Sequence, residues 1–492
     1  MKHEGSSIDR RLFLGAAAAI IATVPSGAVA QRANSGRTTP EAKHVSQIIA
    51  EFVSDFDLKT CPRPVIDQAR AVFLDTIGVM LAGSQEEPAH MIQEMLKAEG
   101  SAPAATVVGQ KQRASAQLAA FANGVAGHAM DYDFTYMRAQ SIAPLIPAIV
   151  SVSEASGATP ARALAAFIVG AEVAARIVRT NQDGPMFDGW HSTGMVGAIG
   201  AAASCAKLLD ASPQAVRDAL GICVSLASGV TGNFGTMTKP LHSGNAARNG
   251  VMAAMLGTRG FSSSATAFEG RAGYFNTFGR GLDINLEPFK DFGVRYDLVS
   301  GRYRFKPYPC GGLTHTAIEA ALELREKLGP RVAEVESIHC YVTRRAAQRA
   351  GTQYPSTGES AKFSVGFLVP YSLVHGAPRI AAFTERALQD ERVRALAKTV
   401  TASVDPELGD GEDDSPARIK LTMANGQVVE QRNDFGSGSN TNPMAPAQIQ
   451  EKFFDCARQA VDTDTARKVF AFLDALPEQV SFTDFWPLLQ KG

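Results

Sequence analysis

Apolar residues recur at helical spacing through most of the chain. Residues 40–56 begin with a proline that can open a helix, and residues 63–83 repeat the pattern and stop at a glycine. Further segments rich in alanine and glycine predict helices over 115–130, 142–156, 160–180, 193–209, 212–230 and 243–258. Small residues let helix backbones approach closely, so most of these glycines indicate helix packing.

The pattern changes after about residue 300. The stretch "VAEVESIHCYVTR" alternates Ile338, Cys340 and Val342 with polar residues and predicts a strand. The stretch "ARIKLTMANGQVVEQR" contains two alternating runs around Asn425-Gly426, which predicts a hairpin. Helical spacing returns over about 446–490. We therefore predict a mainly α fold, in which a large all-helical domain carries an inserted, smaller α+β lid domain. The predicted boundaries are 41–299 for the helical domain, 300–435 for the lid, and 436–492 for helices that return to the helical domain.

The N-terminal 30 residues have the order of a secretory signal. Arg10-Arg11 precede an apolar run over 12–24, and Ala28-Val29-Ala30 form a small-residue cleavage site. The paired arginines are typical of twin-arginine export. The apolar run has 13 residues, against the roughly 20 that span a bilayer. We expect export to the periplasm, cleavage, no stable membrane anchor afterwards, and a polar linker over 31–40.

Composition and charge narrow the class of partner. The chain has 492 residues, of which 45% are hydrophobic and 20% charged, and its net charge is −1. No polybasic block stands in the body of the chain, which argues against nucleic acid and leaves a small molecule as the expected partner. The six cysteines are scattered without CxxC or metal-finger spacing, so the fold is not expected to need disulfides. Cys310, in a Gly-rich loop, is either a reactive thiol or, more commonly for this residue type, a buried structural one.

Four of the nine histidines lie in Gly-rich junctions: His128, His191, His242 and His315. Three of these junctions adjoin predicted helix starts, at Ser192 or Thr193, at Ser243, and at a helix capped by Thr314. A helix N-terminus favours a bound carboxylate or phosphate and lowers the pKa of a histidine beside it. Convergence of such junctions would make an anion site, whereas each alone is more often structural. The sequence lacks an HExxH motif, a calcium-loop spacing, a GxGxxG fingerprint, a Walker loop and a GxSxG elbow, and we expect no metal.

Six blocks occur in order along the chain: "FANGVAGHAMDYDFT", "GWHSTGMVGAIGAAASCAKLL", "GTMTKPLHSGNAARNG", "FEGRAGYF", "KPYPCGGLTH" and "AKFSVGF". They resemble the blocks of the MmgE/PrpD family over about residues 41–480. The resemblance implies a helical domain with an α+β lid, a homodimer, a site between the domains, and no metal or organic cofactor. It also implies proton transfer at a carbon next to a carboxylate, followed by dehydration, decarboxylation or epimerisation.

The resemblance also places eight residues in the site. The catalytic set is Asp131, Thr135, His191, Lys239 and His242, and the substrate-binding set is Lys306, His315 and Ser141. By this resemblance His191 is a base or acid, Lys239 holds a substrate carboxylate or enolate, and His242 orients it. Lys306 is a second cationic group. Asp131 and Thr135 are four residues apart, so a helical turn would place them on one face, while Asp133 would orient its neighbours or cap the turn.

Four positions depart from the family pattern. Phe134 and Ser141 stand where the block usually has an acid and a histidine, Gly311 lies near another family histidine, and Phe367 replaces a frequent tyrosine. These changes predict a less polar pocket. Our leading hypothesis is a cofactor-independent lyase or isomerase, 2-methylcitrate dehydratase-like, that acts on a small di- or tricarboxylate. The alternatives are a non-catalytic periplasmic carboxylate-binding protein on the same scaffold and a purely structural dimer.

Overall fold

The computed structural model describes residues 43–136, 139–180, 188–280, 284–300, 302–409, 415–439 and 441–490. The predicted signal peptide over 1–30 and the linker over 31–40 lie outside the described residues, so they remain predictions. Among the described residues, no helix combines the length and the apolar character needed to cross a membrane.

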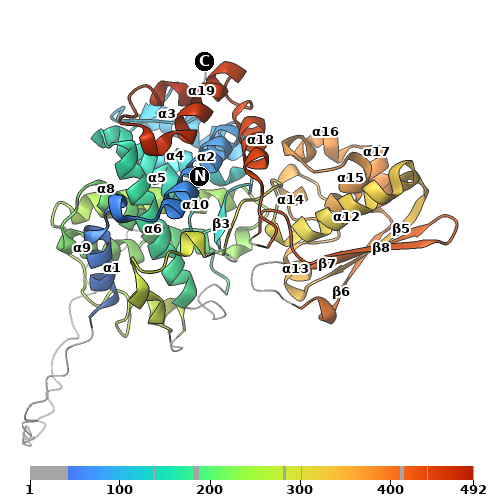
Figure 1. The fold of residues 1–492 in the computed structure, drawn as a ribbon, viewed down its shortest axis with the longest axis horizontal. Coiled ribbons are helices and arrows are strands. Elements are labelled where there is room, and N and C mark those ends of the chain that lie inside the picture. The colour runs from blue at the N-terminus through green and yellow to red at the C-terminus, as the bar shows by residue number, and fades with distance from the viewer. Residues whose placement is uncertain are drawn as a thin grey trace, which may run out of the picture. The chain divides into compact units, whose positions relative to one another are not determined.

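Helices build the N-terminal part of the chain and return at its end (Figure 1). They are α1 (Val45–Asp55), α2 (Arg63–Gly83), α3 (Glu87–Glu99), α4 (Ala116–Ala129), α5 (Leu145–Ser156), α6 (Pro160–Thr180), α7 (Ser192–Met195), α8 (Gly197–Leu208), α9 (Pro213–Val224), α10 (Thr238–Gly257), α11 (Tyr274–Phe278), α18 (Pro446–Ala457) and α19 (Thr463–Asp474). The mainly α prediction is confirmed. Helix α3 was not predicted, α9 ends six residues before its predicted end at 230, and α10 begins at Thr238 rather than at Ser243.

One large core of buried apolar side chains runs through these helices and includes residues of α18 and α19. Helices α4 and α10 cross at close range. A side chain at Gly124 would place its Cβ 2.8 Å from the Cα of Gly244, so both helices need glycine where they cross. The crossing brings the end of α4 close to the start of α10, and these two ends carry His128, Lys239 and His242.

The second part of the chain contains a four-stranded sheet with the order β6-β5-β7-β8. Its strands are β5 (Val335–Val342), β6 (Val400–Val404), β7 (Ala417–Met423) and β8 (Val428–Asn433), and its helices are α12 (His315–Leu328), α13 (Arg344–Arg349), α14 (Gly358–Ala361), α15 (Val365–His375), α16 (Glu385–Leu388) and α17 (Glu391–Ala397). The predicted strand and hairpin are confirmed, with Gly426 at a φ of 80° in the turn. Ile338, Cys340 and Val342 face a core that includes α12 and α15, as their alternation predicts.

Two short ladders complete the fold. Strand β1 (Ala105–Thr106) pairs with β2 (Arg113–Ala114), and β3 (Thr135–Tyr136) pairs with β4 (Tyr303–Arg304). The second ladder ties the segment after α4 to the segment that leads into the sheet region. The predicted domain boundaries at 299 and 435 remain predictions. All six cysteines are buried and unpaired, and burial raises the pKa of Cys310 to about 12, which favours a structural thiol.

Candidate active site

Asp131 is the centre of a buried ion-pair network. It follows the end of α4 with a φ of 50°, a left-handed conformation that is uncommon outside glycine. Its Oδ1 atom is paired with the ammonium groups of Lys239 and Lys306, the latter at 3.1 Å, and accepts a 2.7 Å hydrogen bond from Gln140. Burial alone would raise the pKa of Asp131, but the two ammonium groups bring it well below its usual range. Asp131 is therefore ionised at neutral pH.

Three buried lysines hold the backbone of this turn. Lys362 donates to the carbonyl of Ala129 at 2.9 Å, and Lys306 donates to the carbonyl of Asp131 at 2.7 Å. Lys452 donates to the carbonyl oxygen of the next residue, Tyr132, at 2.8 Å. The lysines come from segments far apart in the sequence: the end of α14, the chain after β4, and α18. Because hydrogen bonds from a charged donor are strong, these contacts fix the turn in its left-handed conformation.

Lys239 and His242 lie inside α10, not before it. The prediction that they precede a helix start at Ser243 is therefore wrong, because α10 begins at Thr238. Lys239 is 4% exposed. Its ammonium group stands 5.9 Å and 5.8 Å from the ring centroids of Phe234 and Phe363. An aromatic face attracts a cation but leaves its N–H donors available. Within the described residues Asp131 is the one hydrogen-bond partner of this ammonium group, so two of its three donors are unused.

The imidazoles of His191 and His242 form a pair. Their Nδ1 atoms are 3.0 Å apart, and the other ring nitrogen of His191, Nε2, lies 3.0 Å from the hydroxyl oxygen of Thr193. Burial lowers the pKa of His191 well below its ordinary value, and neighbouring positive groups lower it further. Burial also lowers the pKa of His242 to about 4. Both rings are therefore neutral at pH 7. The predicted side-chain cap at Ser192 or Thr193 is absent: His191 is the N-cap residue of the short helix α7, without a side-chain bond.

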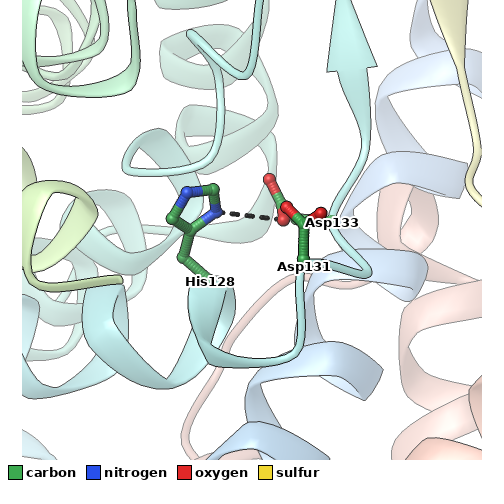
Figure 2. A group of neighbouring side chains, drawn as sticks. All are labelled: His128, Asp131 and Asp133. Atoms are coloured by element: carbon green, nitrogen blue, oxygen red, sulfur yellow. Dashed lines mark hydrogen bonds and ion pairs between the residues drawn. The ribbon is translucent and has the colours of Figure 1, made fainter. Parts of the chain in front are cut away.

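A third imidazole, His128, stacks on His191 with ring centroids 5.5 Å apart. It stands at the end of α4, and its Nδ1 atom lies 3.0 Å from a carboxylate oxygen of Asp133 (Figure 2). Neither residue was in the predicted site, although Asp133 was expected to orient its neighbours. The glycine-rich junction around His128 could have identified this histidine as a site residue. Nothing in the sequence distinguishes Lys452 from an ordinary helical lysine.

The remaining predicted residues are buried beside this network. The hydroxyl groups of Thr135 and Ser141 and the Nδ1 atom of His315 have no hydrogen-bond partner in the described part of the chain. Thr135 lies in β3, so the expectation that a helical turn places it on one face with Asp131 is wrong. Thr314 precedes α12 as its N-cap residue, but its hydroxyl donates to the carbonyl of Gly311 instead of capping the helix. Buried polar atoms without partners are uncommon, so these three groups are candidates for contact with a ligand.

His128, Asp131 and Asp133 also satisfy the geometry of a metal-binding group, because one ligand atom from each lies within 4.8 Å of the others. Figure 2 shows the two carboxylates side by side, with the imidazole bonded to one of them. The charges favour a different use. Two lysine ammonium groups already contact Asp131, and they would repel a divalent cation. The donor set fits an ion-pair network better than a metal site.

The four departures from the family pattern are all buried, and two of them are phenylalanines. Phe134 stacks on Tyr303 with centroids 5.2 Å apart, and Phe367 packs against Tyr354. A Cβ at Gly311 would lie 2.9 Å from the ring of Phe363, so the aromatic side chain occupies the space that a larger residue would need. Ser141 keeps a small buried hydroxyl. The expectation of a less polar pocket remains a prediction.

Comparison with known proteins identifies the family of this chain. The MmgE/PrpD N-terminal domain matches residues 47–287, and the MmgE/PrpD C-terminal domain matches residues 308–476. The chain belongs to the MmgE/PrpD family. Members similar to it include cis-aconitate decarboxylase of Homo sapiens, 28% identical over 89% of this chain and 92% of that protein. The cis-aconitate decarboxylase of Aspergillus terreus strain NIH 2624 is 26% identical over 91% of this chain and 95% of its own length.

Proposed function

We propose that this MmgE/PrpD protein is a cofactor-independent lyase that acts on a small di- or tricarboxylate by removing a proton next to a carboxylate. The observation that carries the proposal is the meeting of two buried lysine ammonium groups at Asp131, beside histidines whose pKa values are lowered. The ammonium groups supply positive charge for a substrate carboxylate, and the neutral imidazoles supply bases.

The proposed reaction is a dehydration of the 2-methylcitrate dehydratase type. A neutral imidazole takes the proton from the carbon next to a carboxylate, and the electron pair moves into that carboxylate as an enediolate. Lys239, with two unused donors, holds the developing charge. The electrons then form a carbon–carbon double bond as the β-hydroxyl leaves, and this hydroxyl takes a proton to become water. A cluster of neutral histidines suits a reaction that begins with proton abstraction.

The test is incubation of the purified protein with 2-methylcitrate, citrate and cis-aconitate in D2O, followed by proton NMR. The proposal expects deuterium at the carbon next to a carboxylate, together with the unsaturated or hydrated product. If none of the three compounds is changed or labelled, dehydration of this substrate class is rejected.

Decarboxylation is the second candidate, and the names of the relatives favour it. In this reaction the bond to a carboxyl carbon breaks, CO2 leaves, and the electron pair that stays on the substrate takes a proton. The step needs a proton donor, which the lysine ammonium groups supply and the neutral histidines do not. Release of CO2 from cis-aconitate, with one deuterium in the product, would choose decarboxylation over dehydration.

A non-catalytic carboxylate-binding protein would use the same lysines without the chemistry. Calorimetry separates this alternative from both enzymes. Binding of citrate or cis-aconitate without deuterium incorporation, release of water or release of CO2 would favour the binding protein.

We also propose that the protein works in the periplasm, on the basis of Arg10-Arg11 and the apolar run that follows them, and that it is a homodimer, on the basis of the family resemblance. Replacing both arginines by lysine should keep the full-length protein in the cytoplasmic fraction, whereas unchanged export would reject the twin-arginine route. Light scattering of the purified protein tests the dimer, because a monomeric mass would contradict it.

A further inference from the structure

His128 carries a buried ring nitrogen that has no partner. Its side chain is fully buried, Nδ1 lies 3.0 Å from Asp133 Oδ1, and Nε2 meets no hydrogen-bonding atom among the described residues. Figure 2 shows the ring held from one side by the carboxylate, with its other nitrogen directed away from it. We infer that His128, oriented by Asp133, is the base that removes the substrate proton, an inference that rests on the proposed function.

The partner of Nδ1 determines which nitrogen of His128 holds the lone pair. An ionised carboxylate only accepts hydrogen bonds, so Nδ1 carries the hydrogen and Nε2 is the basic nitrogen. Once Nε2 has taken a proton, the adjacent carboxylate stabilises the imidazolium that forms. This is the role of the carboxylate in a serine-protease triad. His128 therefore has an available lone pair and a group that favours its protonated form.

His191, the base or acid that the resemblance implies, has both ring nitrogens in use. The hydroxyl of Thr193 donates its single hydrogen to the carbonyl of Gln140 at 3.0 Å. His191 Nε2 must therefore donate to the Thr193 oxygen, and its Nδ1 accepts from His242 Nδ1. The lone pair of His191 is occupied, so the structure favours a positioning role for this residue beneath the ring of His128.

The two other histidines also offer a lone pair, but their partners are neutral. His242 donates through Nδ1 to His191, which leaves Nε2 basic but without a carboxylate among its hydrogen-bond partners. His315 donates through Nε2 to the carbonyl of Cys310 at 3.3 Å, which leaves Nδ1 basic. Neither partner stabilises an imidazolium as a carboxylate does. Of these four histidines, His128 alone combines a free buried nitrogen with a carboxylate.

In the proposed dehydration, His128 both removes the proton from carbon and gives it to the leaving hydroxyl. Nε2 takes the proton from carbon, and the pair of electrons left behind moves into the substrate carboxylate, where Lys239 holds it. The imidazolium then gives this proton to the departing hydroxyl, which leaves as water. The products are the unsaturated acid and water, and His128 is neutral again.

The first experiment compares His128→Gln with His191→Gln. The proposal expects His128→Gln to lower kcat by roughly 10²–10⁴-fold, the usual contribution of a general base, while the Kd of tricarballylate changes by less than about threefold. Tricarballylate is a saturated tricarboxylate that has no hydroxyl to lose, so calorimetry with it reports binding alone. His191→Gln should keep more activity than His128→Gln. The reverse order, or a His128→Gln enzyme within a few-fold of wild type, overturns the inference.

The second experiment follows the pH dependence of kcat/KM in Asp133→Asn. The charged or titratable groups that face His128 are Asp131, Asp133, Lys239, His191 and His242. Removing the Asp133 carboxylate destabilises the imidazolium, so the acid limb of the profile should move to lower pH while the plateau falls. A structural role alone would lower the plateau without moving the limb, and an unmoved limb contradicts the inference.

A third measurement needs no turnover and separates this inference from the proposed function. Long-range ¹H–¹⁵N NMR of protein labelled at histidine reports the tautomer of His128. An unprotonated Nε2, whose shift moves when tricarballylate is added, keeps His128 as the proton acceptor of the site even if none of the tested acids is consumed. A His128 that carries its hydrogen on Nε2, or that does not respond to tricarballylate, overturns the assignment.

Discussion

Two buried charge clusters in this protein have opposite balances of donors and acceptors. Arg176 of α6 is fully buried, and it meets three carboxylates and a main-chain carbonyl. The carboxylates are those of Glu172, Asp291 and Asp297, and the carbonyl belongs to Arg295. In the active site, two lysines and an amide converge on a single carboxylate oxygen of Asp131.

This difference distinguishes a charge cluster that stabilises the fold from one that can bind a ligand. Around Arg176 the two terminal nitrogens of the guanidinium donate to acceptors, while Nε has no hydrogen-bond partner among the described residues. These bonds tie residues 291–297 to α6, so the cluster stabilises the fold. Around Asp131, Lys239 keeps two donors that no described residue uses, and nearby hydroxyl and imidazole groups also lack partners among the described residues. Burial alone therefore does not identify a site, whereas an excess of buried donors favours the binding of an anion.

The largest expected effect is a loss of stability in a variant that disrupts the cluster around Arg176. Arg176→Met removes the one cation shared by three carboxylates and should lower the free energy of unfolding by about 3–5 kcal/mol, because buried negative charges lose their partner. Urea unfolding measures this loss. The matched control is Arg179→Met, since Arg179 is partly exposed and pairs with Asp297 alone, and it should cost less. If the two variants lost the same free energy of unfolding, Arg176 would stabilise the fold no more than Arg179 does, which would contradict this prediction.

The second-largest expected effect comes from a variant of the candidate active site, which should lose turnover more than stability. Lys239→Met should lower kcat by roughly 10²–10³-fold, the usual result of removing one donor from a developing oxyanion. Its cost in stability should be smaller than that of Arg176→Met, because Asp131 keeps Lys306 and Gln140. The control is Lys207→Met, since Lys207 donates to a main-chain carbonyl of α1 and has no contact with the site. Unchanged turnover in Lys239→Met would remove this lysine from the mechanism.

The comparison also shows what the sequence can predict. Helix α2 and the hairpin of β7 and β8 follow from local patterns, because glycine stops the helix and Asn425-Gly426 makes the turn. The predicted site residues Asp131, Lys239 and Lys306 came from ordered family blocks, and the fold brings them together. Long-range contacts have no such local signal. Lys452 lies 320 residues from the carbonyl that it bonds, and α10 starts earlier than its apolar pattern suggests because polar residues of its first turn are buried by the site.

The pH dependence of stability should differ between the two clusters. His242 has a folded pKa of about 4, lowered by burial, against about 6.5 in the unfolded chain. The unfolded chain therefore binds a proton first as the pH falls, so the stability present above pH 6.5 is lost between about pH 6.5 and 4. For this buried ring the loss is on the order of 2–3 kcal/mol.

Urea unfolding at pH 7.5, 6 and 5 measures this slope. His242→Gln should make the slope shallower, because it removes one of the groups that titrate. Arg176→Met should lower stability most at pH 7.5, because burial raises the pKa of Glu172 to about 7 and the loss of Arg176 raises this pKa further, so protonation of Glu172 relieves part of the loss at lower pH. A slope that is the same in wild type and His242→Gln would contradict the lowered pKa.

The smallest expected effects come from removing one buried hydroxyl group beside the candidate active site and one in the helical core. Thr135 and Ser204 both carry buried hydroxyls without a partner, the first beside the active site and the second in the helical core. Removing an unsatisfied buried hydroxyl is nearly neutral or stabilising, by up to about 1 kcal/mol, so Thr135→Val and Ser204→Ala should both fold normally. If the Thr135 hydroxyl bonds the substrate, Thr135→Val should weaken tricarballylate binding by roughly tenfold, the value of one hydrogen bond, and Ser204→Ala should leave it unchanged. Equal affinities in the two variants would mean that the Thr135 hydroxyl is an ordinary packing defect like that of Ser204.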